Sequence, residues 1–276
     1  MPPVAAAIPA TAPSTVVSAD GTQIVTLQEG RGRPIVIVHG GSSRASQWAR
    51  VAGALAGGFR VVRIERRLYG GSGPPRSPHA MAREVEDVEA VLARLGEPAM
   101  LVGHSSGGVV ALETALRQPA NLAALALYEP PVAVTAPLGG AALKRARAAV
   151  DRGRPGRAMA IHLVKVVEMP WLTVTLLRLT AAWKDLRAWA PAQIADDEAM
   201  ASLGVGIDRY ARIAIPTLLL GGGRSPAHLR RGLASLARVI PGARQVELPD
   251  QAHVANLSAP GEVAGCLWDF AEAMLA

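Results

Sequence analysis

The chain has 276 residues, of which 50% are apolar and 18% charged, and its formal net charge is +7. This composition excludes a disordered chain, and a chain of this length buries roughly 70–75% of its unfolded surface, which is enough for a sizeable core. The single cysteine, Cys266, excludes an internal disulfide and a thiolate metal site. Because the six histidines show no H-x-x-H or H-E-x-x-H spacing, the sequence predicts no metal site.

The first residues are rich in proline and alanine, and residues 1–14 are predicted to form a flexible lead-in. A secretory signal is not expected, because a basic first segment is absent and four prolines break the apolar helix that such a signal needs. No uninterrupted apolar stretch reaches the roughly 18–20 residues that span a bilayer. We therefore expect no membrane segment and a cytoplasmic protein.

The positive charge raises the question of a nucleic-acid partner. Its densest part is interrupted only by Asp151 and contains no aromatic residue. We therefore expect no nucleic-acid partner and interpret this basic cluster as a solvated helix face. An anionic substrate or carrier that approaches this face is the alternative. The basic cluster consists of Lys144, Arg145, Arg147, Arg152, Arg154 and Arg157.

Short β-branched runs alternate with helical patterns along most of the chain. In chain order, the sequence predicts strands at 15–18, 22–28, 34–39 and 59–65, a helix at 80–95, a strand at 99–103, a helix at 107–117, strands at 122–128 and 215–220, a helix at 226–239, a strand at 243–248 and a helix at 260–275. Asp20-Gly21 is a two-residue hairpin signal between the first two strands. This alternation predicts an α/β fold, with a mostly parallel central sheet flanked by helices.

One long stretch interrupts the alternation. Residues 135–208 contain no clear strand and several helix-like segments, so we expect an inserted helical cap or lid on a core formed by 15–134 and 209–276. The tryptophans of this stretch either pack the cap or line a substrate cavity. They are Trp171, Trp183 and Trp189.

The sequence Gly103-His104-Ser105-Ser106-Gly107 lies between a predicted strand and a predicted apolar helix. The turn between them must be sharp, and it forces Ser105 into a strained backbone conformation with small neighbours. Such a turn holds the Ser105 hydroxyl at a helix N-terminus, where amide dipoles favour a developing negative charge. We predict Ser105 to be a nucleophile; the alternative is a small-residue turn that only allows close packing.

Two backbone amides are candidates for an oxyanion hole. The glycines after the first buried strand leave the amide of Gly41 approachable, and the Ser106 amide is the second candidate. His39 ends that strand and is expected to be structural. Trp48 follows the same loop, and contact with substrate is a weaker expectation for it.

A serine hydroxyl near neutral pH needs an imidazole within hydrogen-bond reach to become a good nucleophile. His253 follows the last predicted strand, where parallel sheets place functional groups, and we predict it to be the base. His228, in a helical stretch, and His162, in the predicted cap, are expected to be surface or packing residues.

The glycines at 40 and 41 after a buried strand, the Gly103-x-Ser105-x-Gly107 elbow and a late His253 together strongly resemble the α/β-hydrolase superfamily. The resemblance covers nearly the whole chain beyond residue 15, and residues 135–208 occupy the position of the family's helical cap. It implies a Ser–His–acid triad that needs neither a metal nor an organic cofactor.

The sequence departs from the family at the acid. The acid usually follows the penultimate strand, but no Asp or Glu occurs between Asp208 and Glu247. Some members carry it after the strand that follows the nucleophile helix, where this chain has Glu129. We predict Glu129 to be the acid; the alternatives are Asp250 and an acid-less pair in which Ser225 or a water orients the imidazole.

The resemblance implies a serine hydrolase that cleaves an ester or thioester. The apolar residues of the predicted cap favour a small-molecule substrate with an apolar acyl or aromatic group. The same triad also performs C–C hydrolysis, perhydrolysis, and acyl transfer or cyclisation in secondary metabolism, and these stay open. A catalytically idle ligand-binding protein on the same fold is a further alternative.

Overall fold

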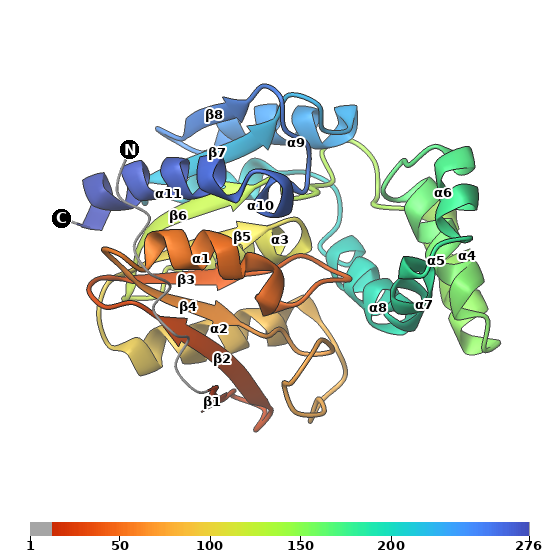
Figure 1. Ribbon diagram of the computed structural model, residues 1–276, viewed down its shortest axis with the longest axis horizontal. Helices are drawn as coiled ribbons and strands as arrows, with labels where there is room; N and C mark the ends of the chain where they lie inside the picture. The colour runs from red at the N-terminus through yellow and green to blue at the C-terminus, as the bar shows by residue number, and fades with distance from the viewer. Residues whose placement is uncertain (1–12, 276) are drawn as a thin grey trace.

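The computed structural model describes residues 13–275, and the strands in this range form one eight-stranded sheet (Figure 1). The order across the sheet is β1-β2-β4-β3-β5-β6-β7-β8. β1 pairs antiparallel with β2, β2 pairs antiparallel with β4, and all other pairs are parallel. The strands are β1 (Ser14–Val17), β2 (Gln23–Glu29), β3 (Pro34–Val38), β4 (Arg60–Ile64), β5 (Ala99–His104), β6 (Leu122–Tyr128), β7 (Thr217–Gly222) and β8 (Arg244–Leu248).

The predicted fold class is confirmed, and each predicted strand lies within two residues of an observed one. β3 and β5 are buried along their whole length, as expected of parallel strands covered on both faces. The β1–β2 connection is longer than the predicted two-residue turn. The Asp20 carboxylate accepts a hydrogen bond from the Thr22 amide, and Gly21 has a φ of 83°, so residues 18–22 form a wider loop.

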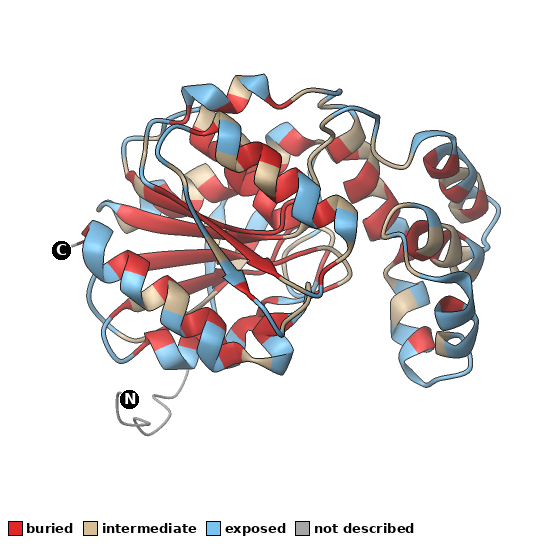
Figure 2. Cartoon of the chain, turned by 90° about the horizontal axis from the view of Figure 1, so that it is seen from above, coloured by how far each residue is buried: buried red, intermediate tan, exposed pale blue. Residues whose placement is uncertain are grey.

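Helices cover both faces of the sheet (Figure 2). Each face has its own hydrophobic cluster. One face packs against α2 (Met81–Leu95), α3 (Ser106–Leu116) and α9 (Ala227–Val239), and the other against α1 (Ala49–Leu55) and α11 (Pro260–Leu275). The short helices η1 (Ala45–Trp48), η2 (Asp208–Arg212) and α10 (Ala255–Ser258) complete the core. α1 was not predicted from the sequence.

The helices between β6 and β7 pack beside the carboxyl ends of the parallel strands, and we call them the cap (Figure 1). They enclose a third hydrophobic cluster that is separate from the two clusters of the core. They are α4 (Gly140–Asp151), α5 (Pro155–Lys165), α6 (Trp171–Leu177), α7 (Ala182–Ala188) and α8 (Ala190–Ala201), and all lie inside the range 135–208.

Residues 1–12 of the predicted lead-in lie outside the described residues, and Ser14 already belongs to β1, so the lead-in was drawn too long. Within residues 13–275, no helix has the length and the apolar character needed to cross a membrane.

Candidate active site

Ser105 lies in the sharp turn between β5 and α3, with φ 52° and ψ −127°. Residues other than glycine rarely adopt backbone angles in this region, so the turn stores strain. The neighbours must be glycine, because a Cβ at Gly103 would lie 2.6 Å from the Gly107 carbonyl and a Cβ at Gly107 would lie 2.3 Å from the His39 carbonyl. These contacts hold the Ser105 side chain above the carboxyl end of the sheet.

His253 and Glu129 are joined by a hydrogen bond of 2.7 Å between Nδ1 and Oε2. Glu129 directly follows β6, is fully buried and has a positive φ of 47°. Its second carboxylate oxygen accepts a 2.8 Å hydrogen bond from the Gly222 amide at the end of β7. The carboxylate is therefore satisfied on both oxygens and directed at the imidazole.

Gly221-Gly222-Gly223 takes the place where the family usually has its acid. The His253 loop fills the space around these glycines, since a Cβ at Gly222 would lie 2.5 Å from the Gln251 carbonyl and a Cβ at Gly223 would lie 2.5 Å from the Pro249 carbonyl. There is thus no room here for a carboxylate side chain.

Two aromatic side chains hold the loop that carries His253. The Tyr128 hydroxyl donates to the Ala252 carbonyl and accepts a 3.1 Å hydrogen bond from the Ala255 amide. His104 Nε2 donates to the His253 carbonyl at 2.8 Å, and the His104 ring stacks on Tyr128. Burial and the neighbouring His253 lower the pKa of His104 well below its usual value, so His104 stays neutral.

Neither Asp250 nor Ser225, the two other side chains considered for orienting His253, forms a hydrogen bond with its ring. Asp250 is exposed and pairs with Arg224 at 2.7 Å. The Ser225 hydroxyl is buried and has no hydrogen-bond partner within residues 13–275.

The two amides predicted for the oxyanion hole belong to residues that line the same cavity as Ser105. Within the described chain, neither the Gly41 amide nor the Ser106 amide has a hydrogen-bond acceptor. Gly40 lets the loop lie close to Ser105, because a Cβ there would lie 2.9 Å from the Ser105 Cβ. His39 is fully buried, with Nδ1 bonded to the Gly40 carbonyl at 2.7 Å, which is the structural role expected for it.

A cavity of about 260 Å³ lies between the core and the cap and contains both Ser105 and His253. Its walls are mostly apolar, and no lysine or arginine lines it. The tryptophans of the cap are absent from its lining, as is Trp48, which packs against His104 inside the core. The apolar walls from the cap are Met159, Leu163, Val166, Val167, Leu186 and Met200.

The expectation that His162 and His228 are surface or packing residues misses their position at the cavity. Both line it, and each pairs with a carboxylate: His162 with Asp197 at 2.6 Å, and His228 with Glu168 at 3.0 Å. These partners come from other elements, so no local sequence pattern could have revealed the pairs.

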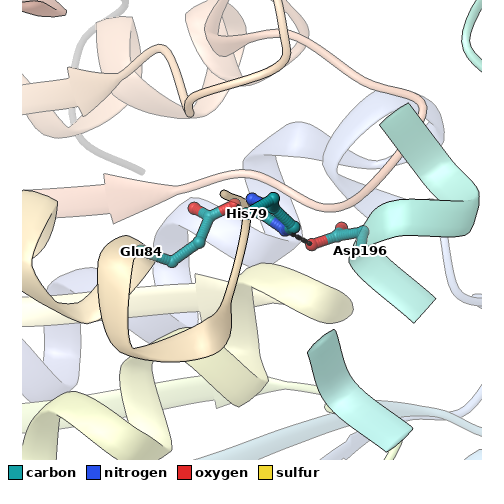
Figure 3. Close-up of side chains that lie close together, drawn as sticks. All are labelled: His79, Glu84 and Asp196. Atoms are coloured by element: carbon teal, nitrogen blue, oxygen red, sulfur yellow. Dashed lines mark ion pairs between the residues drawn. The ribbon is translucent and has the colours of Figure 1, made fainter. Parts of the chain in front are cut away.

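A buried cluster of charges ties the cap to the core beneath the elbow. Figure 3 shows His79, Glu84 and Asp196, whose ligand-type atoms lie within 4.8 Å of one another. Arg66 already pairs with both carboxylates, at 3.0 Å from Glu84 and 2.6 Å from Asp196, and it donates to the Ser106 hydroxyl at 2.8 Å. A metal ion here would sit beside the guanidinium, so the arrangement is typical of an ion-pair network rather than of a metal centre.

Burial alone would raise the pKa of Asp196, but the charge and hydrogen bond of Arg66 and the nearby imidazole of His79, 3.8 Å away, lower it below its usual range. Asp196 is therefore ionised and lies on α8, so this network anchors a cap helix next to the nucleophile elbow.

Comparison with known proteins gives one family. The model of the alpha/beta hydrolase family matches residues 35–265. A crystal structure of an alpha/beta hydrolase from Sphaerobacter thermophilus is 35% identical, covers 93% of this chain and 99% of its own, and superposes with a TM-score of 0.83.

The first curated relatives match a shorter part of the chain. A non-heme haloperoxidase from Rhodococcus erythropolis is 36% identical over 95 residues, which is 34% of this chain and 35% of that protein. The chain thus spans less than half the length of the first curated relatives that it matches. A pimeloyl-[acyl-carrier protein] methyl ester esterase from Edwardsiella ictaluri is 25% identical over 250 residues, or 87% of this chain and 93% of that one.

Proposed function

Because the chain belongs to the alpha/beta hydrolase family, we propose that it is a serine hydrolase that cleaves a carboxylic ester or thioester through an acyl-enzyme. The observation that carries the proposal is the 2.7 Å bond between His253 and the buried Glu129, at a cavity that also contains Ser105. Nothing about this arrangement requires an organic cofactor.

The chemistry follows from the hydrogen bonds. With Nδ1 bound to Glu129, His253 has Nε2 left to remove the proton from the Ser105 hydroxyl. Ser105 attacks the acyl carbon, and Glu129 holds the ring in the correct tautomer and stabilises the imidazolium that forms.

The amides of Gly41 and Ser106 bind the oxyanion of the tetrahedral intermediate. His253 then gives this proton to the leaving alcohol or thiol as the acyl-enzyme forms. In the second half it takes a proton from the water that attacks the acyl carbon, and it returns that proton to the Ser105 oxygen as the bond to Ser105 breaks and the acid leaves.

The cavity supports a small substrate with an apolar acyl or aromatic group. Its volume of about 260 Å³ is below the roughly 300–1,000 Å³ of pockets for drug-sized ligands. A large leaving group must therefore extend out of the cavity. The basic cluster on α4, on the turn after it and at the start of α5 is our candidate surface for an anionic carrier of such a substrate. Its members are exposed except Arg147, which is half-buried and pairs with Glu198.

Perhydrolysis is a second candidate, favoured by the similarity to a non-heme haloperoxidase. In that reaction hydrogen peroxide replaces water in the attack on the acyl-enzyme, and a peracid leaves instead of an acid. The test is peracid formation from acetate ester and peroxide, measured as bromide oxidation and compared with the Ser105→Ala variant.

The main proposal is tested by the pre-steady-state release of p-nitrophenol from a butanoate ester. We expect a burst of about one equivalent from the wild type, because acylation of Ser105 precedes hydrolysis. The burst is absent in Ser105→Ala. Equal release by the wild type and Ser105→Ala would contradict the assignment of the nucleophile.

A further inference from the structure

Four polar side chains at the cavity form a continuous hydrogen-bond network. The Ser42 hydroxyl donates to Gln193 Oε1 at 2.9 Å, and Gln193 Nε2 donates to Asp197 Oδ1 at 3.0 Å. His162 Nδ1 donates to the other carboxylate oxygen of Asp197 at 2.6 Å. All four residues line the cavity, with His162 on α5 and Gln193 and Asp197 on α8.

Burying these polar groups costs desolvation free energy, and the need to fill space does not account for it. Asp197 is 1% exposed and His162 7% exposed, and an apolar pair of the same size would fill the space without desolvating a carboxylate. Asp197 is satisfied on both oxygens by Gln193 and His162. The last polar atom of this hydrogen-bond network is therefore His162 Nε2.

The tautomer of His162 follows from its partner. Because Asp197 accepts the hydrogen bond from Nδ1, the hydrogen of a neutral imidazole lies on Nδ1 and its Nε2 carries a lone pair. Within residues 13–275, Nε2 has no hydrogen-bond partner. A cavity-lining acceptor whose orientation is fixed in this way suits a ligand group that donates a hydrogen bond.

The surroundings favour a neutral donor over an anion. No lysine or arginine lines the cavity, and the negative charge of Asp197 lies directly behind the imidazole. A buried carboxylate or phosphate on the substrate would face this charge without a permanent cation to balance it. A hydroxyl is neutral and needs no cation, because it can donate its hydrogen to the lone pair on Nε2.

We propose that His162, positioned by Asp197, is a specificity residue that accepts a hydrogen bond from a hydroxyl on the acyl part of the substrate. This inference rests on the proposed ester hydrolysis and names its substrate class: short, otherwise apolar hydroxyacyl esters. Ser105 and the oxyanion amides come from the core, whereas His162 comes from the cap, so the hydroxyl lies at the end of the acyl group remote from the scissile bond.

The test compares p-nitrophenyl butanoate, hexanoate and octanoate with the same esters carrying a terminal hydroxyl. The wild type is expected to show a higher kcat/KM for the hydroxylated ester at one of these chain lengths. In His162→Leu the ratio of hydroxylated to plain ester falls by about tenfold, the value of one hydrogen bond. In Asp197→Asn, which keeps the shape of the pair but removes its charge, the ratio falls by a smaller factor.

His228→Leu is the matched control, because His228 also lines the cavity and also pairs with a carboxylate. Its ratio should equal that of the wild type. An unchanged ratio in His162→Leu at every chain length would overturn the proposal. So would loss of the preference in His228→Leu alone, or a preference of the wild type for terminal carboxylate or amide over hydroxyl.

A binding experiment separates this proposal from the proposed function. Calorimetry with Ser105→Ala measures the Kd of hexanamide and of its terminally hydroxylated form, so no turnover is needed. Tighter binding of the hydroxylated amide, lost when His162→Leu is added, supports the subsite even if no ester is hydrolysed. Equal Kd values for both amides contradict it even if Ser105 forms an acyl-enzyme.

Discussion

At the scale of single residues, two glycines account for the position that we propose for the acid. Gly222 and Gly223 leave no space for a side chain at the end of β7, and the Gly222 amide instead donates to Glu129 at the neighbouring strand end. The family resemblance pointed to Glu129, because no acidic residue occurs between Asp208 and Glu247 and some members carry the acid after the strand that follows the nucleophile helix. The positive φ of Glu129 and the tight fit of the His253 loop could not be predicted, since both depend on contacts between distant segments.

His104 gives a prediction for stability against pH. Because burial and His253 lower its pKa below 6.5, the unfolded chain takes up a proton below this pH while folded His104 does not. The stability associated with neutral His104 is thus present above pH 6.5 and lost as pH falls, by about 1.4 kcal/mol per pH unit.

In His104→Phe this loss is absent, so the difference in unfolding free energy between wild type and variant shrinks as the pH is lowered. Urea denaturation at a series of pH values measures it. Parallel pH profiles for the two proteins would show that His104 does not titrate in this way.

At the scale of elements, the His253 loop and the end of β7 depend on each other. Gly222→Ala places a Cβ against the Gln251 carbonyl, so we expect a loss of about 1–3 kcal/mol of stability and a reduced kcat from the displaced His253. Gly53→Ala is the control, because this α1 glycine has open space around its Cβ position. It should gain about 0.5–1 kcal/mol from helix propensity. Thermal unfolding and ester hydrolysis of both variants decide this; equal behaviour would refute the steric argument.

The anchoring of α8 gives a second prediction at this scale. Asp196→Asn removes one of the two carboxylates around Arg66, and breaking such a buried pair costs about 3–5 kcal/mol. Since the folded pKa of Asp196 is lowered from 3.8, its contribution is present above about pH 4 and is lost as pH falls further.

The difference between wild type and Asp196→Asn in urea denaturation should therefore be large at neutral pH and decrease below pH 4. A difference that is independent of pH would mean that the charge of Asp196 does not stabilise the cap.

At the scale of the whole molecule, the core could be predicted and the cavity could not. Buried strands and amphipathic helices carry their period in the local sequence, which is why every predicted core strand lies close to its observed place. The cavity arises only when the cap folds onto the core. The pairing of His162 with Asp197, 35 residues apart, and the burial of Arg66 against Asp196, 130 residues apart, have no local signal.

The measurement that tests the account most directly is the kcat of ester hydrolysis in Glu129→Gln compared with Asp250→Asn. Both substitutions replace a carboxylate near His253 by an amide, but only Glu129 touches the imidazole, while Asp250 is exposed and paired with Arg224. We predict that kcat falls by about ten-thousandfold in Glu129→Gln, through loss of the correct tautomer, and stays at the wild-type value in Asp250→Asn. Full activity in Glu129→Gln, or a large loss in Asp250→Asn instead, would contradict the assignment of Glu129 as the acid that orients His253.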